Sequence, residues 1–218
     1  MMRSKTVQFL NVIALLLMTG CFSSKNLYMS DGTNEFNSVT KCFLGKWNIN
    51  SYSRSGEEVI NSIFTKGTLS LDHASREAVF TFWVSDSFVN SKLTDWKVKW
   101  PDLEVNEYKV ISSGTWKISK SGEILYFEDM VNSIDIKGNG ENFEGFFGSE
   151  QMKFTASEHV GSDAGLGGML ARAATKKVTG TEILFPKVFQ QYNFEISPNK
   201  ESINVKGINS NSFDIARN

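Results

Sequence analysis

The chain is poor in the residues that mark several common protein classes. Its 218 residues include two cysteines, two histidines and three prolines. Two cysteines cannot build the disulfide framework of a small secreted domain, and three prolines exclude a proline-rich low-complexity chain. A formal net charge of −1 provides no basic surplus for binding nucleic acid. We therefore expect neither a disulfide-stabilised domain nor a nucleic-acid-binding protein.

Aromatic side chains, in contrast, are plentiful. The chain contains 17 Phe, five Trp and five Tyr. A disordered segment could not keep so many apolar rings in water, so the sequence predicts a folded protein with a substantial core. Its length suits one domain better than several.

The N-terminus has the features of a secretory leader. Arg3 and Lys5 precede an apolar run over residues 7–18, which includes Gln8 and Asn11. A membrane-spanning helix needs roughly 20 apolar residues. This shorter run therefore indicates the core of a signal peptide.

The residues that follow the leader resemble the lipobox of bacterial lipoproteins. Thr19-Gly20-Cys21 provides two small residues before a cysteine, although Met18 stands where Leu is commoner. The resemblance implies that residues 1–20 are removed, that the cysteine receives a diacylglycerol thioether, and that its new amine is acylated. Several acyl chains would anchor the protein permanently to a membrane of the bacterial cell envelope, and we expect the outer membrane. The alternative is ordinary secretion with this cysteine as a free thiol.

The mature chain divides into a short tether and one domain. Residues 21–41 are rich in Ser and Asn and show no sustained period, so we expect a flexible tether. Over residues 42–218, short alternating runs recur between turn residues, which is typical of antiparallel strands. We expect an all-β, mainly antiparallel domain of about 8–10 strands. The runs cover residues 43–52, 68–71, 79–84, 96–100, 108–118, 124–127, 134–136, 143–154, 181–194, 202–205 and 212–215.

Residues 162–178 have a different pattern. Leu166, Met169, Leu170 and Ala173 recur at helical spacing. We expect an α-helix packed on the outside of the sheet. The alternative is a small-residue helix that dimerises or enters a membrane.

Two Gly-x-Trp motifs begin alternating runs. Gly45 and Trp47 form the first, Gly114 and Trp116 form the second, and the segment FTKGTL lies between them. This order resembles the lipocalin-like domains of envelope lipoproteins from Bacteroidetes-type bacteria, and the likeness covers residues 43–138. It implies a lipocalin-like β-barrel in which the first Trp plugs a closed end. The alternative is that both indoles are ordinary core residues.

Residues suited to metal binding or nucleophilic catalysis are scarce. His73 and His159 are the only histidines, and a catalytic zinc site normally has three protein ligands. We expect both histidines at the surface and no metal or cofactor. Cys42 has no neighbouring histidine to lower its pKa, so we expect a small buried residue there.

Paired carboxylates offer a weak signal for glycoside chemistry. The pairs Glu104/Glu107 and Glu141/Glu144 would need to converge on one bond. On strands and loops we expect them to face solvent. The sequence thus predicts no enzyme.

Several aromatic residues are candidates for ligand or surface recognition. Trp96 and Trp100 alternate with lysines, as in an amphipathic strand with indoles inside, or in a glycan-binding platform if both rings are exposed. Phe80, Phe82 and Trp83 lie in the most apolar run of the domain.

The expected function follows from these features together. We expect a non-catalytic, lipid-anchored envelope protein that binds a small apolar ligand in its barrel. The alternatives are a filled barrel that serves as an accessory subunit of an envelope complex, and an enzyme of unrecognised type. An apolar cavity of several hundred Å³ would favour the first, and a solid core with an exposed apolar patch the second.

Overall fold

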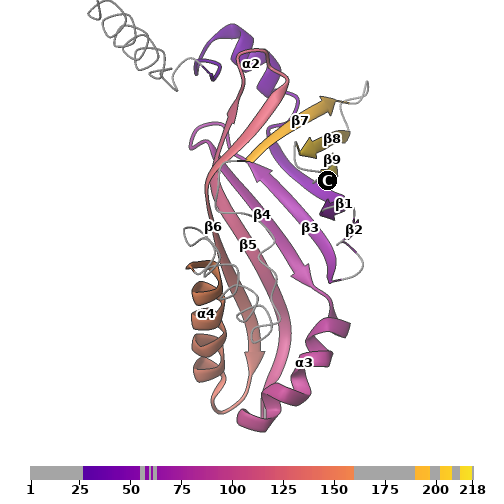
Figure 1. The fold of residues 1–218 in the computed structure, drawn as a ribbon, viewed down its shortest axis with the longest axis vertical. Coiled ribbons are helices and arrows are strands. Elements are labelled where there is room, and N and C mark those ends of the chain that lie inside the picture. Colours follow the sequence, from indigo (N-terminus) through magenta and orange to yellow (C-terminus); the bar gives the residue numbers. More distant parts are fainter. Residues whose placement is uncertain are drawn as a thin grey trace, which may run out of the picture.

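A computed structural model gives the fold of the chain (Figure 1). It describes residues 27–54, 57–58, 60, 63–159, 190–196, 202–207 and 212–217. The leader, Cys21 and the helix expected over 162–178 lie outside the described residues. In the described part of the chain, no helix is long and apolar enough to cross a membrane.

The described residues form one antiparallel sheet. Its strands are β1 (Gly45–Arg54), β2 (Glu57–Glu58), β3 (Phe64–Leu71), β4 (Glu77–Val84), β5 (Glu104–Ile118), β6 (Ile124–Asn139), β7 (Gln190–Ile196), β8 (Ser202–Gly207) and β9 (Ser212–Arg217). Their order is β2-β1-β3-β4-β5-β6-β7-β8-β9, and β9 pairs in addition with β1. The prediction of a mainly antiparallel β fold is confirmed.

Alternation along β4 and β5 places large apolar side chains on the inner face of the sheet. In β4, Ala78, Phe80, Phe82 and Val84 are buried, whereas the residues between them are half-buried. The same period continues in β5, where every second residue from Tyr108 to Ser112 is buried. The inner faces of these strands therefore share one hydrophobic core.

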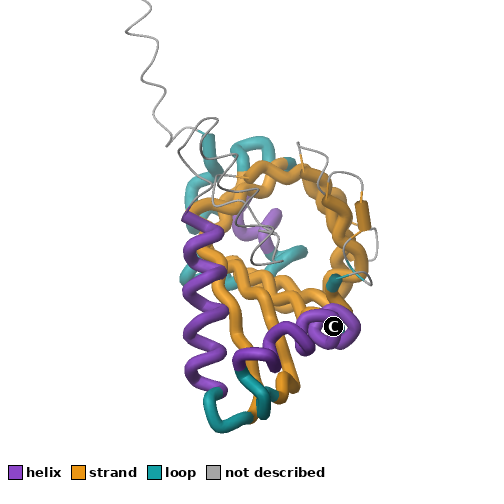
Figure 2. The backbone as a smooth tube through the Cα atoms, turned by 60° about the horizontal axis from the view of Figure 1, so that its bottom comes forward, coloured by secondary structure: helices purple, strands orange, loops and turns teal. Residues whose placement is uncertain are grey.

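Two helices cover one end of the sheet. α3 (Asp86–Lys99) and α4 (Phe143–His159) lie beside the long strands β5 and β6, at the end opposite α2 (Asn34–Thr40) (Figures 1 and 2). Trp96 of α3 packs edge-on against Phe146 of α4, with ring centroids 5.1 Å apart. This contact extends the core beyond the shorter strands.

The strand expected over residues 96–100 is wrong, because these residues end α3. The Ser85 hydroxyl caps this helix by accepting a hydrogen bond from the Phe88 N–H at 3.3 Å. Trp96 and Trp100 are four residues apart, so their spacing fits one helical face as well as one face of a strand.

The strand expected over residues 143–154 is also wrong, because α4 occupies this segment. Phe146, Glu150 and Phe154 are buried at intervals of one helical turn. Gly145 and Gly148 weaken the helical signal in the sequence, because glycine is a poor helix former.

The structure differs from the expected tether over residues 27–41. Thr33 caps α2 by accepting a hydrogen bond from the Phe36 N–H, and the Phe36 ring is buried in the core. The Met29 N–H donates to the Ile118 carbonyl at 2.8 Å. One buried ring and a strand-like contact thus hold this polar segment on the sheet.

Candidate functional site

Trp47 is fixed at the start of β1. Gly45, with φ of +107°, adopts a backbone conformation that favours glycine as the chain enters the strand. The buried indole donates from Nε1 to the Phe43 carbonyl at 2.7 Å. The Arg217 guanidinium lies over the ring, with Cζ 4.8 Å from the centroid, and donates from Nη2 to the Cys42 carbonyl.

Trp116 is fixed in a similar way on β5. Its buried indole donates from Nε1 to the Asp72 carbonyl at 2.9 Å, and its backbone N–H donates to the Arg76 carbonyl at 3.0 Å. The backbone approaches closely at Gly114, where a Cβ would lie 2.5 Å from the Glu128 carbonyl oxygen. The second Gly-x-Trp motif therefore needs its glycine for space.

The structure brings the two Gly-x-Trp motifs together through Phe43. Its carbonyl accepts the hydrogen bond from Trp47, and its ring contacts Trp116 edge-on at 5.8 Å between centroids. Both indoles thus belong to one aromatic cluster near α2.

A rigid turn before β4 positions Arg76 beside this cluster. The Asp72 carboxylate accepts hydrogen bonds from the Ser75 N–H and hydroxyl, each at 2.7 Å. These bonds lower the pKa of Asp72 below its usual range. Arg76 has φ of +59°, a conformation that is uncommon for any residue other than glycine.

The Arg76 guanidinium packs on two aromatic rings. Its Cζ lies 3.9 Å from the Phe36 centroid and 4.9 Å from the Trp116 centroid. The two rings are stacked, with an interplanar angle of 10°. Arg76 Nη2 also forms an ion pair with Asp31 at 2.9 Å. The guanidinium, from the turn before β4, therefore contacts α2, β5 and Asp31 near the start of the described chain.

A pocket of about 580 Å³ lies beside Arg76, between the N-terminal segment and β5. This volume is within the range of small-molecule sites. Its inner wall includes apolar side chains, and its rim is polar. The pocket is lined by Tyr28, Met29, Ser30, Asp31, Phe36, Arg76, Thr115, Trp116, Lys117, Ile118 and Asp129.

Ion pairing and hydrogen bonding order the rim. Lys117 Nζ lies 2.5 Å from a Glu128 carboxylate oxygen and 4.6 Å from the Tyr28 ring centroid. The Tyr28 hydroxyl donates to the other oxygen of Glu128. Burial and this hydrogen bond raise the pKa of Tyr28 above its usual range.

Two of the expected recognition residues fill the interior of the sheet. The Phe80 ring contacts Phe127 at 5.0 Å and Phe213 at 5.7 Å between centroids. The Phe82 ring contacts Phe64 at 5.1 Å. These rings pack against one another across strands that are distant in the sequence.

Trp83 lies on the outer face of β4, away from those rings. Its Nε1 donates to Glu107 at 3.0 Å, and the Lys66 ammonium lies 4.4 Å from the ring centroid. Glu107 also pairs with Lys109 at 2.6 Å and Lys137 at 3.0 Å. Hydrogen bonds from these two lysines lower the pKa of Glu107 to about 2.

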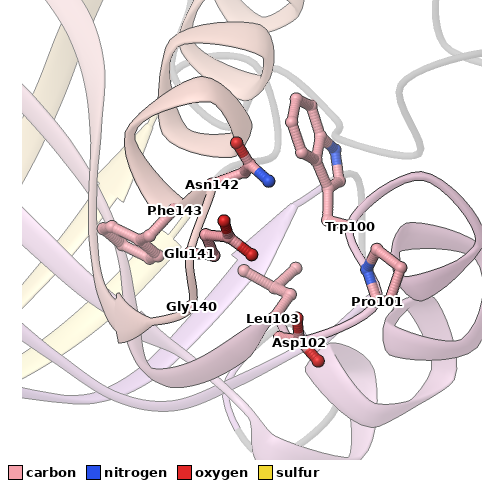
Figure 3. Close-up of a pocket in the computed structure, with 8 residues that line it drawn as sticks. All are labelled: Trp100, Pro101, Asp102, Leu103, Gly140, Glu141, Asn142 and Phe143. Carbon is pink, nitrogen blue, oxygen red and sulfur yellow. The ribbon is translucent and has the colours of Figure 1, made fainter.

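Trp96 and Trp100 do not form an exposed platform. Trp96 packs between the helices, and Trp100 lies beside a small hollow where the connections into β5 and α4 meet (Figure 3). A Cβ on Gly145 would contact the Trp100 ring at 3.2 Å, so α4 approaches this indole closely. The hollow, of about 10 Å³, has room for one water molecule at most.

The remaining candidates are dispersed. Glu104, Glu141 and Glu144 are exposed, and Glu107 is engaged by lysines. Cys42 is a half-buried free thiol. Across the described ranges, no group of three or more His, Cys, Asp or Glu residues could hold a metal ion.

Apart from Trp116, the residues that line the pocket carry no recognisable sequence motif. Tyr28 and Asp31 belong to a polar stretch without a regular period, and Arg76 lies in a turn. Their common location depends on tertiary contacts with β5, for which the sequence gives no local signal.

No family model matches the chain. No curated protein matches it significantly either. The candidate site therefore rests on its geometry.

Proposed function

We propose that the chain is a lipid-anchored, non-catalytic protein of the bacterial cell envelope that binds a small apolar ligand. The leader and Cys21 support the anchor, and the outer membrane is the proposed location. The observation that carries ligand binding is the pocket of about 580 Å³, which is lined by the half-buried Tyr28 and Met29 in front of the buried Phe36, Trp116 and Ile118.

We further propose that the sheet is a lipocalin-like barrel. The register between β1 and β9 supports closure, because it runs from Trp47 opposite Arg217 to Ser53 opposite Ser212. The junction of the two Gly-x-Trp motifs through Phe43 supports a plugged end.

One observation favours a second candidate function. The inward rings of Phe64, Phe80, Phe82, Phe127 and Phe213 contact one another at 5.0–5.7 Å. Such packing is typical of a filled barrel, which would serve as an accessory subunit of an envelope complex.

A fluorescent apolar probe distinguishes these functions. Ser30 is exposed at the pocket rim, and its side chain can be enlarged without removing its backbone carbonyl, which accepts from Thr33. The matched control is Ser70, which is exposed on β3 outside the pocket. We expect the wild-type protein and Ser70→Trp to bind the probe and Ser30→Trp to lose binding. Equal binding by all three, or no binding by any, would contradict ligand carriage in this pocket.

A further inference from the structure

The N-terminal segment attaches to one end of the sheet. The Lys120 N–H donates to the Leu27 carbonyl at 3.1 Å, and the Met29 N–H donates to the Ile118 carbonyl at 2.8 Å. α2 lies against the same turn between β5 and β6, since a Cβ on Gly122 would contact the Val39 side chain at 3.4 Å. We call Leu27, α2 and this turn the α2 end of the molecule.

The chain between the lipobox cysteine and the α2 end is short. Six residue steps separate Cys21 from Leu27. At about 3.3–3.6 Å per residue, they span at most roughly 20 Å. A flexible tether of twice that length or more would let the folded body rotate freely, whereas this connection places one particular end near its point of attachment.

The opposite end of the molecule lies far from this point. β5 has 15 residues, and at about 3.3 Å per residue it extends roughly 50 Å from the turn that follows α3 to the α2 end. α3 and α4 occupy that distant end (Figure 1). Val98, near the end of α3, is 84% exposed there.

We infer that the α2 end is the membrane-facing surface of the protein and that its partner is the phospholipid bilayer that holds the acylated Cys21. The inference rests on the proposed lipid anchor. The pocket lies beside the N-terminal segment, so it opens close to the lipid headgroups.

The chemistry of the α2 end fits a contact held by the covalent anchor. Leu27 is 54% exposed and is available to enter the headgroup region. Exposed charges of both signs occur at the α2 end, with Glu35 in α2, Lys41 directly after it, and Lys120 and Glu123 in the turn between β5 and β6. This balance gives little attraction to anionic lipid, so we expect the orientation to be insensitive to salt.

Energy transfer to labelled lipid tests the orientation. The acylated protein is reconstituted in phosphatidylethanolamine–phosphatidylglycerol vesicles that contain a rhodamine-labelled lipid. In a Cys42→Ser background, a donor dye is attached to Ser38→Cys on α2 or to Val98→Cys on α3. Both positions are exposed.

The two labels should report very different distances. Because the ends lie roughly 50 Å apart, we expect transfer from position 38 to exceed transfer from position 98 at least about threefold. Inserting a 12-residue Gly/Ser linker between Ser24 and Lys25 should reduce the difference. Equal transfer, or stronger transfer from position 98, would overturn the inference.

Flotation of the same vesicles separates this inference from the proposed anchor. If a Cys21→Ser variant floats as well as the wild-type protein, the anchor fails and the inference fails with it. If flotation needs Cys21 but the labels transfer equally, the anchor stands and the orientation alone is wrong.

Discussion

The guanidinium of Arg217 lies over the indole of Trp47, with its Cζ 4.8 Å from the ring centroid. These residues also face each other in the register between β1 and β9. One cation–π contact therefore joins the first long strand of the sheet to the last.

Arg217→Ala should destabilise the protein. The substitution removes a cation–π contact worth about 0.5–1 kcal/mol and the hydrogen bond to the Cys42 carbonyl, worth about 1 kcal/mol. We expect the free energy of unfolding, measured with urea, to fall by about 1–2 kcal/mol. Arg217→Lys keeps the charge but loses the planar donor group, so its free energy of unfolding should lie between those of the wild-type protein and Arg217→Ala. An unchanged urea midpoint for Arg217→Ala would show that this contact does not stabilise the sheet.

Trp116→Phe should cost more than Trp83→Phe. Trp116 is buried and donates to the Asp72 carbonyl, so the variant leaves that acceptor without its partner and creates a void. We expect a loss of about 2–3 kcal/mol from the free energy of unfolding. Trp83 is half-buried on the outer face, where water can replace the lost N–H. Similar losses in both variants would contradict the assignment of Trp116 to the core cluster.

Gly114→Ala and Gly148→Ala should have opposite effects. A Cβ on Gly114 would lie 2.5 Å from the Glu128 carbonyl oxygen, so β5 and β6 would have to separate. A Cβ on Gly148 meets nothing within 4 Å, and alanine favours the helix at this position of α4 by about 1 kcal/mol. Thermal unfolding should show a lower midpoint for the first variant and a higher midpoint for the second. A stabilising Gly114→Ala would contradict the close approach of the two strands.

Glu107 should contribute to stability above pH 4.5 and lose this contribution in acid. Lys109 and Lys137 lower its pKa from 4.5 to about 2 in the folded protein. A carboxyl group with a depressed folded-state pKa stabilises the fold above its unfolded pKa, and the effect disappears as the pH falls through the folded pKa.

Glu107→Gln tests this dependence. The variant should have a lower urea midpoint than the wild-type protein above pH 4.5, and the difference should vanish as the pH approaches 2. Glu123→Gln, at an exposed position, is the matched control. A constant difference across the acid range would show that Glu107 acts through packing and not through its charge.

The alternating runs were sufficient to predict the sheet, but they also led to the prediction of strands where the structure has the helices α3 and α4. In β4, residues 79–84 form a short and nearly continuous apolar run of β-branched and aromatic side chains, which is typical of a buried strand. In α3, the spacing of Trp96 and Trp100 fits one face of a helix and one face of a strand equally well. The feature that identifies the helix is its N-cap, Ser85, which lies eleven positions before Trp96. A short aromatic run can therefore be assigned to a helix or a strand only together with the capping residues that flank it.

Only the two tryptophans of the candidate site could be predicted from the sequence. Trp47 and Trp116 are identified by local Gly-x-Trp motifs, whereas Arg76 reaches its position through a turn and through Phe36 of α2. Phe36 in turn belongs to a segment whose composition indicates a tether. Contacts between segments so distant in the sequence leave no periodic pattern in either of them.

Native mass spectrometry of the protein extracted from its own host tests lipid anchoring and ligand binding together. We expect a chain that begins at an acylated Cys21 and carries an additional noncovalent mass of a small molecule, which the Ser30→Trp variant lacks and the Ser70→Trp variant keeps. A chain whose Cys21 carries no lipid, or an acylated chain without any additional small-molecule mass in all three proteins, would contradict this expectation.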